Sequence, residues 1–126
     1  MILDKFNEFF DGQSIVGAAT SNVVDLGAGG VRATYIPLVA QITEKAVGAG
    51  NITLTFEVSK DKAFTTPKTI LEAKASGADM VAGYQFPART VPRTTERYMR
   101  VKLSSTGITG GKIYVGVTPY LQDNEA

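Results

Sequence analysis

The stretch Asn51–Ser59 has the sequence Asn-Ile-Thr-Leu-Thr-Phe-Glu-Val-Ser, in which apolar and polar side chains alternate. Its apolar positions are Ile52, Leu54, Phe56 and Val58. Successive side chains of a β-strand point to opposite faces, whereas a helix would spread these four around its axis. The β-branched Thr and Val residues also fit a pleated surface. The stretch therefore predicts a strand with one buried face.

The same period of two recurs elsewhere along the chain. It is clear in residues 38–45, 79–86, 98–104 and 112–118, and weaker in 14–19, 21–26 and 69–75. Glycine-rich turns separate these stretches, and the prolines fall in loops or at strand edges, where a missing N–H is tolerated. About eight short strands with such turns indicate an antiparallel sandwich, jelly roll or small barrel. The only helical candidate is Asp4–Phe10.

Length and charge limit the class of protein. The chain has 126 residues, of which 44% are apolar and 20% charged, so we expect one globular domain over residues 1–126. The 13 basic and 12 acidic residues leave a net charge of +1, which gives no electrostatic case for a nucleic-acid partner. No apolar run approaches the roughly 20 residues that span a bilayer, and no secretory signal is recognisable. We therefore predict neither a nucleic-acid nor a membrane partner.

The chain contains no Cys, His or Trp. Thiol nucleophiles, Ser-His-Asp catalysis, and ordinary zinc or haem ligation are thereby excluded. The acidic residues are scattered, and no two flank an aromatic stretch as a glycosidase pair would. The glycine-rich stretches 27–32 and 110–113 match phosphate-binding loops only superficially and predict turns. We predict a protein that is not an enzyme, with no cofactor, metal or small-molecule substrate.

Four arginines lie close together in the second half of the chain, interleaved with Thr and Tyr. They are Arg89, Arg93, Arg97 and Arg100. One interpretation is a solvated loop that leads into a strand. The other is a contact patch for an acidic protein surface, because a guanidinium group binds carboxylates through two hydrogen bonds and is favoured at interfaces.

Three phenylalanines, Phe6, Phe9 and Phe10, lie near the N-terminus. They either pack under the sandwich as core residues or form an arm that docks on a neighbouring subunit. Aromatic side chains suit both roles, because they bury a large area and often dominate the energetics of interfaces. The sequence leaves both alternatives open.

Several motifs occur in order along the chain. They are Met1-Ile2-Leu3-Asp4, Asp11-Gly12-Gln13, Ser21-Asn22-Val23-Val24-Asp25-Leu26-Gly27, the alternating strand 52–59, Arg97-Tyr98-Met99-Arg100-Val101, and Gly111-Lys112-Ile113-Tyr114-Val115-Gly116-Val117. In this order they resemble the jelly-roll capsid cement, or decoration, proteins of tailed bacteriophages, a family known from a Bordetella phage. The resemblance covers nearly the whole chain and brings no catalytic residue with it. It implies an all-β antiparallel sandwich, a jelly roll of about eight strands, with residues 1–13 as a short N-terminal arm.

The resemblance also implies a function. A cement protein binds the outer surface of an HK97-type capsid and bridges neighbouring major capsid protein subunits, which stabilises the shell. Its implied partners are the major capsid protein and other copies of itself, with a dimer favoured, and its location is the outer capsid surface of the virion after synthesis in the host bacterial cytoplasm. Our candidate contact residues are Ile2, Leu3, Phe6, Phe9, Phe10, Arg89, Arg93 and Arg97. The apolar side chains would supply affinity, and the arginines would fix the orientation against acidic groups.

The alternative function is a β-sandwich ligand-binding module, specific for a carbohydrate or a receptor, in a tail fibre or a secreted protein. Its groove would be lined by Tyr35, Tyr84, Tyr114 and Tyr120. Sugar sites usually stack a ring on an aromatic side chain, so the absence of Trp counts against this alternative.

Overall fold

The structure is a computed structural model that describes residues 7–26, 37–87, 90–92 and 94–117. Its strands are β1 (Asn7–Ser14), β2 (Ala18–Thr20), β3 (Val24–Asp25), β4 (Leu38–Val47), β5 (Asn51–Ser59), β6 (Lys68–Ser76), β7 (Tyr98–Thr106) and β8 (Gly110–Val117), with one 3₁₀ turn, η1 (Gly77–Asp79). Within these residues, no helix has the length and apolar character that a membrane crossing requires.

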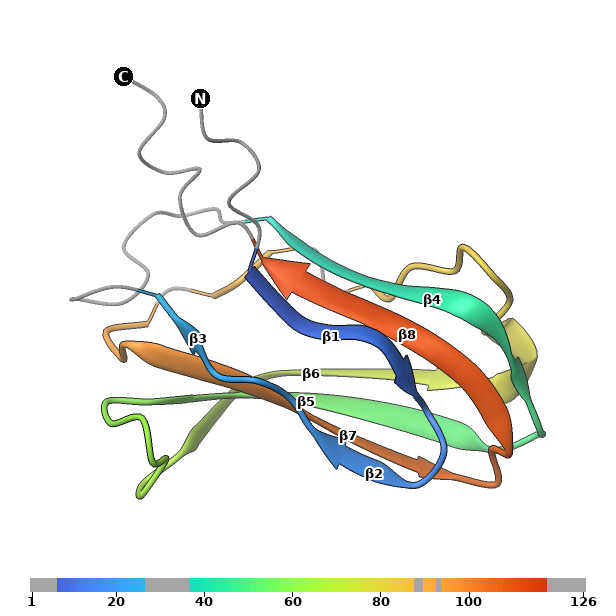
Figure 1. Cartoon of the computed structure of the whole chain (residues 1–126), viewed down its shortest axis with the longest axis horizontal. Coiled ribbons are helices and arrows are strands. Elements are labelled where there is room, and N and C mark those ends of the chain that lie inside the picture. The colour runs from blue at the N-terminus through green and yellow to red at the C-terminus, as the bar shows by residue number, and fades with distance from the viewer. Residues whose placement is uncertain (1–6, 27–36, 88–89, 93, 118–126) are drawn as a thin grey trace.

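The strands form two antiparallel sheets that pack face to face (Figure 1). The smaller sheet has the order β1-β8-β4, and the larger has the order β2-β7-β5-β6, with β3 also paired to β7. The fold predicted from the sequence, an all-β antiparallel sandwich of about eight strands, is confirmed.

The strand order is that of a jelly roll, in which a long antiparallel hairpin is rolled up. The first strand pairs with the last, β2 and β3 pair with β7, and β5 pairs with β6. On its other edge, β4 is hydrogen-bonded to the irregular segment 80–86, which takes the place of the fourth strand that a jelly-roll sheet has. The Ile42 N–H donates to the Tyr84 carbonyl at 2.9 Å, and the Phe86 N–H donates to the Ala40 carbonyl at 2.9 Å.

Strand β5 coincides with the stretch that decided the sequence analysis, and its four alternating apolar side chains are fully buried. The core between the sheets is completed by side chains from every strand except β2. Its largest fully buried members are Phe9, Phe56, Phe86, Ile15, Leu38, Ile42, Ile52, Leu54, Met80, Met99 and Leu103. The alternation of apolar and polar residues in β4, β5, β7 and β8 therefore predicted most of the core.

The N-terminal predictions need correction. Asn7–Phe10, predicted as part of a helix, belongs to strand β1, and an arm that extends to residue 13 is therefore wrong. The pairing of β1 with β8 shifts register between Glu8 and Phe10. A bulge of this kind interrupts strict alternation, so the consecutive Phe9 and Phe10 are both buried. Phe9 and Phe10 thus suggest a helix in the sequence although they lie on a strand.

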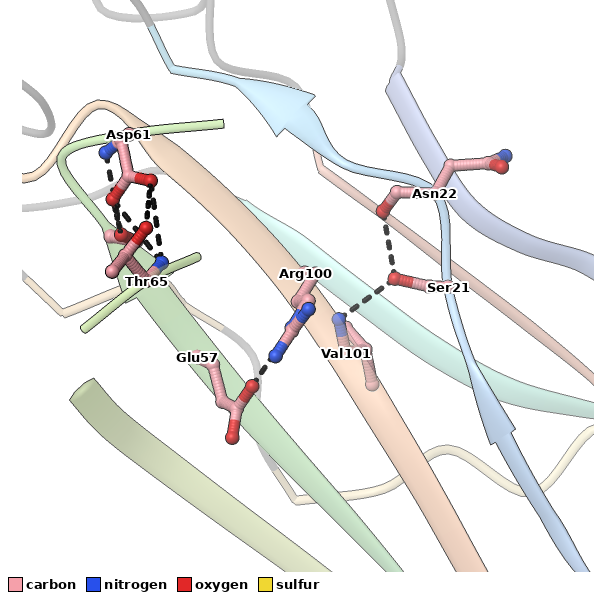
Figure 2. A network of polar contacts seen from close by, with 8 residues as sticks. Ser21, Asn22, Glu57, Asp61, Thr65, Arg100 and Val101 are labelled. Carbon is pink, nitrogen blue, oxygen red and sulfur yellow. Dashed lines mark hydrogen bonds and ion pairs between the residues drawn. The ribbon is translucent and has the colours of Figure 1, made fainter. Parts of the chain in front are cut away.

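Strand β7 holds β2 and β3 on the same edge, and Ser21 occupies the gap between them (Figure 2). The Val101 N–H donates to Ser21 Oγ at 2.8 Å, and the Ser21 N–H donates to the Val101 carbonyl at 2.8 Å. The Ser21 hydroxyl itself donates to the Asn22 carbonyl at 2.8 Å. A side chain thus supplies a hydrogen bond where the sheet ladder is interrupted.

Two hairpin turns meet at the end of the sandwich where β4 joins β5. The Gly50 N–H donates to the Gly107 carbonyl at 3.3 Å, and a Cβ on Gly50 would lie 1.5 Å from the Thr106 carbonyl oxygen. No side chain fits at that separation, because the atom in the way belongs to the backbone. Gly50 is therefore required by close backbone approach.

We expect Gly50→Ala to lower the free energy of unfolding by more than about 3 kcal/mol, because two hairpins must separate. Gly110→Ala is the matched control. Its Cβ would lie 3.2 Å from Val47 Cγ2, the end of a side chain, so its cost should stay below about 1 kcal/mol. Urea unfolding of both variants measures the difference, and equal stabilities would contradict the close-approach argument.

Candidate interaction surfaces

The register brings several sequence-distant positions to one end of the sandwich. Asn7 and Leu38 both pair with Val117, and Asp25 pairs with Tyr98. Figure 1 shows this end on the left, where β1, β4 and β7 begin and β3 and β8 finish. We call it the arginine end, defined by Asn7, Asp25, Leu38, Tyr98 and Val117. The opposite end holds the glycine-rich hairpins.

Arg97 lies at the arginine end and is held by Asp25. Its Nε and Nη2 donate to the two carboxylate oxygens of Asp25, each at 2.8 Å, and the guanidinium carbon lies 5.3 Å from the centre of the Tyr98 ring. The hydrogen bonds that Arg97 donates to Asp25, and the negative charge of Asp25, raise the pKa of Arg97 above its usual value. Both side chains stay nearly half exposed, at 46% and 47%. The pair is therefore preorganised yet reachable by a partner.

The other candidate contact residues divide into two groups. Ile2, Leu3, Phe6, Arg89 and Arg93 lie outside the described residues. The stretches that contain them join the sandwich at the arginine end, because β1 starts there and because Thr90 bridges Pro37 just before β4. The described residues next to those stretches therefore lie at the same end of the sandwich as Arg97.

Phe9 and Phe10 are 2% and 4% exposed and belong to the core. The first alternative of the sequence analysis, that these rings pack under the sandwich, describes both. Their side chains cannot also contact a partner without opening the sandwich, so we remove them from the candidate surface. The bulge in β1 is the physical reason that both point inward.

Arg100 does not join Arg97, although only two residues lie between them in the sequence. Its Nε donates to Glu57 Oε1 at 2.9 Å across the outer face of β5 and β7 (Figure 2). The centre of the Phe64 ring lies 4.3 Å from its guanidinium carbon. The side chains of Arg100 and Glu57 are only 20% and 12% exposed. Arg100 thus has a structural role, and the four-arginine cluster of the sequence does not form one patch.

The loop after β5 covers this ion pair, and the sequence analysis missed it. Phe64 is 6% exposed and has a φ of 54°, a conformation that is costly for an aromatic residue. Asp61 holds the loop, because its carboxylate accepts hydrogen bonds from the Ser59 hydroxyl at 2.9 Å and the Thr65 hydroxyl at 2.8 Å. Ser59 and Thr65 lie two positions before and four positions after Asp61, a spacing typical of turns. This spacing was the sequence signal that could have predicted the loop.

The tyrosine groove of the alternative function does not form from the described residues. Tyr84 lies opposite Ile42 and packs edge-on against Phe86, with ring centres 5.4 Å apart, so it faces the core. Tyr114 pairs with Gln41, one position along β4, so it lies on the outer face. Burial first, and then Glu8 and Asp11, raise the pKa of Tyr114. Tyr35 and Tyr120 lie outside the described residues.

The hydrogen bonds from Thr65 and Ser59 lower the pKa of Asp61 below 3.8. The carboxylate therefore stabilises the loop above pH 3.8, and this contribution is lost as the pH falls through the lowered pKa. We expect Asp61→Asn to lower the melting temperature by about 3 °C at pH 7, with the difference from the unmodified protein shrinking toward pH 2.

Glu44→Gln is the control for this loop prediction, because Glu44 is an exposed acid whose nearest charge, Lys112, is 3.8 Å away. Melting curves between pH 2 and pH 7 measure both variants. A temperature difference for Asp61→Asn that did not depend on pH would contradict the assignment.

Among solved structures, the chain is similar to TmCBM61 in complex with β-1,4-galactotriose, with 13% sequence identity and a TM-score of 0.36. The match covers 89% of this chain and 65% of that one, so the chain spans less than two thirds of the length of this neighbour. A TM-score this low gives no ground for transferring the sugar ligand. A comparison with the curated proteins gives no match.

The model of the family Bbp16 matches residues 9–117, from within β1 to the end of β8. The match thus covers both sheets and the whole described core. This match confirms the Bordetella phage family that the order of motifs suggested. The chain belongs to the Bbp16 family, which is named for a Bordetella phage protein.

Proposed function

We propose that this chain is a capsid cement protein, which binds the outer surface of an HK97-type phage shell and bridges neighbouring major capsid protein subunits. The observation that carries the proposal is the family match over the entire sandwich, which indicates a structural protein of a bacteriophage virion. The proposed partners are the major capsid protein and a second copy of the chain, and the proposed activity is adhesion without catalysis.

The build of the sandwich suits this role. Its core is continuous between the two sheets, and ion pairs such as Arg100–Glu57 and Lys68–Glu96 tie the outer surface and loops to the strands. A stiff protein loses little conformational entropy on binding, so the free energy of weak contacts is not cancelled by the cost of ordering the chain. Repeated over a closed shell, such contacts gain strength through multivalency.

The arginine end is the surface we assign to the shell. It presents the exposed Arg97–Asp25 pair, and the stretches with Ile2, Leu3, Phe6, Arg89 and Arg93 join the sandwich there. Acidic groups of a shell subunit would compete with Asp25 for the guanidinium of Arg97. Such a contact would fix the orientation of the protein on the shell. The apolar residues before β1 would supply buried area.

We expect removal of residues 1–6 to weaken binding to undecorated shells by at least tenfold, since the deletion takes the apolar residues and leaves β1 intact. Arg97→Ala should weaken binding several-fold with little loss of stability, because an exposed ion pair contributes little to folding. Co-sedimentation with purified shells measures both effects.

Lys112→Glu is the control for shell binding. Lys112 pairs with Ser14 toward the opposite end of the sandwich and is 53% exposed, so its reversal should leave binding unchanged. Full binding by both the truncated chain and Arg97→Ala would contradict the assignment of the arginine end. Failure of the unmodified chain to sediment with shells would overturn the cement proposal.

A further inference from the structure

Strand β6 has a long edge that no other described strand pairs with. Among the strands described, the other outer edges are broken: β1 has two register shifts, and β2 and β3 are three and two residues long. The free edge of β4 is covered by the segment 80–86. Strand β6 is nine residues long and pairs only with β5. Such an edge is a template for another strand.

The hydrogen-bond pattern shows which groups of β6 face outward. The Gly77 N–H donates to the Gly50 carbonyl at 2.7 Å, and Gly77 is in line with the regular register in which Ala73 pairs with Leu54. Because bonded and non-bonded pairs alternate in an antiparallel ladder, Ala73 and Ala75 bond to β5, while Glu72 and Lys74 direct their N–H and C=O groups away from it. No backbone group in the described part of the chain bonds to that edge.

The outward-facing positions carry opposite charges two residues apart. Glu72 and Lys74 are 50% and 70% exposed, and Lys74 Nζ lies 3.8 Å from Glu72 Oε1. An exposed pair with this spacing contributes little to the stability of one chain. Both side chains are therefore free to exchange their partner at small cost.

These charges select one register for a second copy of the chain. If two β6 strands run antiparallel with Ala73 opposite Ala73 of the partner subunit, each Glu72 faces Lys74 of the partner subunit. A shift by two residues in one direction places Glu72 against Glu72 of the partner subunit, and in the other Lys74 against Lys74 of the partner subunit. Opposite charges facing each other across strands stabilise a sheet, and like charges destabilise it.

The inner face fits the same register. Leu71 would lie opposite Ala75 of the partner subunit, and both residues are now only half-buried at the rim of the core. At the axis, the two Ala73 residues would form a non-hydrogen-bonded pair, where the Cα atoms of facing strands approach to about 4.5 Å and a small side chain fits. The outward-facing backbone groups, the charges and the apolar contacts therefore all favour the register with Ala73 at the axis.

We propose that two copies of the chain join edge to edge through β6, with a twofold axis at Ala73, so that their larger sheets become one continuous sheet. The occupant of the edge is thus a second copy, since the Glu72–Lys74 pattern is complementary to itself. This inference rests on the pairing of copies in the proposed function and names its surface. The dimer carries two arginine ends, which suits a bridge between neighbouring shell subunits.

Cysteine substitution tests the axis directly, because the chain has no cysteine of its own. We expect Ala73→Cys to form a covalent dimer on mild oxidation, since the two sulfur atoms would meet at the axis. Ala75→Cys is the matched control. Its two copies would lie four residues apart along the strand, roughly 13 Å, which exceeds the reach of a disulfide. It should stay monomeric in a denaturing gel.

Charge reversal tests the register in a second way. Lys74→Glu should weaken the dimer at least tenfold in sedimentation equilibrium, because it places like charges across the axis. The double variant Glu72→Lys/Lys74→Glu should restore the dimer, since the opposite charges face each other again. Lys102→Glu, an exposed reversal on β7 away from the β6 edge, should have no effect.

Three results would overturn the inference. The first is a single-chain mass for the unmodified protein at every concentration up to about 1 mM, above which association counts as non-specific. The second is oxidation of Ala75→Cys as readily as Ala73→Cys, and the third is cross-linking of Ala73→Cys to a shell protein instead of to itself. All but the last use purified chain without shells. Loss of shell binding with an intact dimer would count against the cement proposal alone.

Discussion

Strand β5 is hydrogen-bonded along both edges, to β6 and β7, and its inner face contributes four fully buried side chains. A shift of one residue in either pairing would turn Ile52, Leu54 and Phe56 outward and place Thr and Glu in the core. The register of β5 therefore constrains its neighbours. Through β7 it sets the positions of Asp25, Arg97 and Arg100, and through β6 it decides which groups face the open edge.

Most of the fold could be predicted because burial on one face leaves a period of two in the sequence. Where the backbone departs from a regular strand, the signal failed. The bulge in β1 placed Phe9 and Phe10 on the same side and suggested a helix. Phe64 lies in a loop that crosses the outer face, so no alternation announces its burial. Segment 79–86 was found as a strand candidate, although it pairs with β4 only irregularly.

The candidate surface was harder to predict than the fold. Four arginines close in sequence suggested one patch, but alternation along β7 and its flanking loop sends Arg97 to Asp25 and Arg100 to Glu57. A single sequence does not reveal which acid lies across a sheet, because that depends on strand order. Strand order also separates Tyr84 from Tyr114, which lie on opposite faces of the smaller sheet. The jelly-roll prediction came from the resemblance, and the strand pairing supports it.

The pairing of β1 and β4 with β8 has a consequence for biosynthesis. Strand β8 lies between them, so the middle strand of the smaller sheet leaves the ribosome after all the other described strands. Until then β1 and β4 have no central partner, and the apolar face of the larger sheet stays uncovered. The smaller sheet cannot form until β8 has been synthesised, and contacts this distant in sequence form slowly. The nascent chain is therefore a natural client for chaperones.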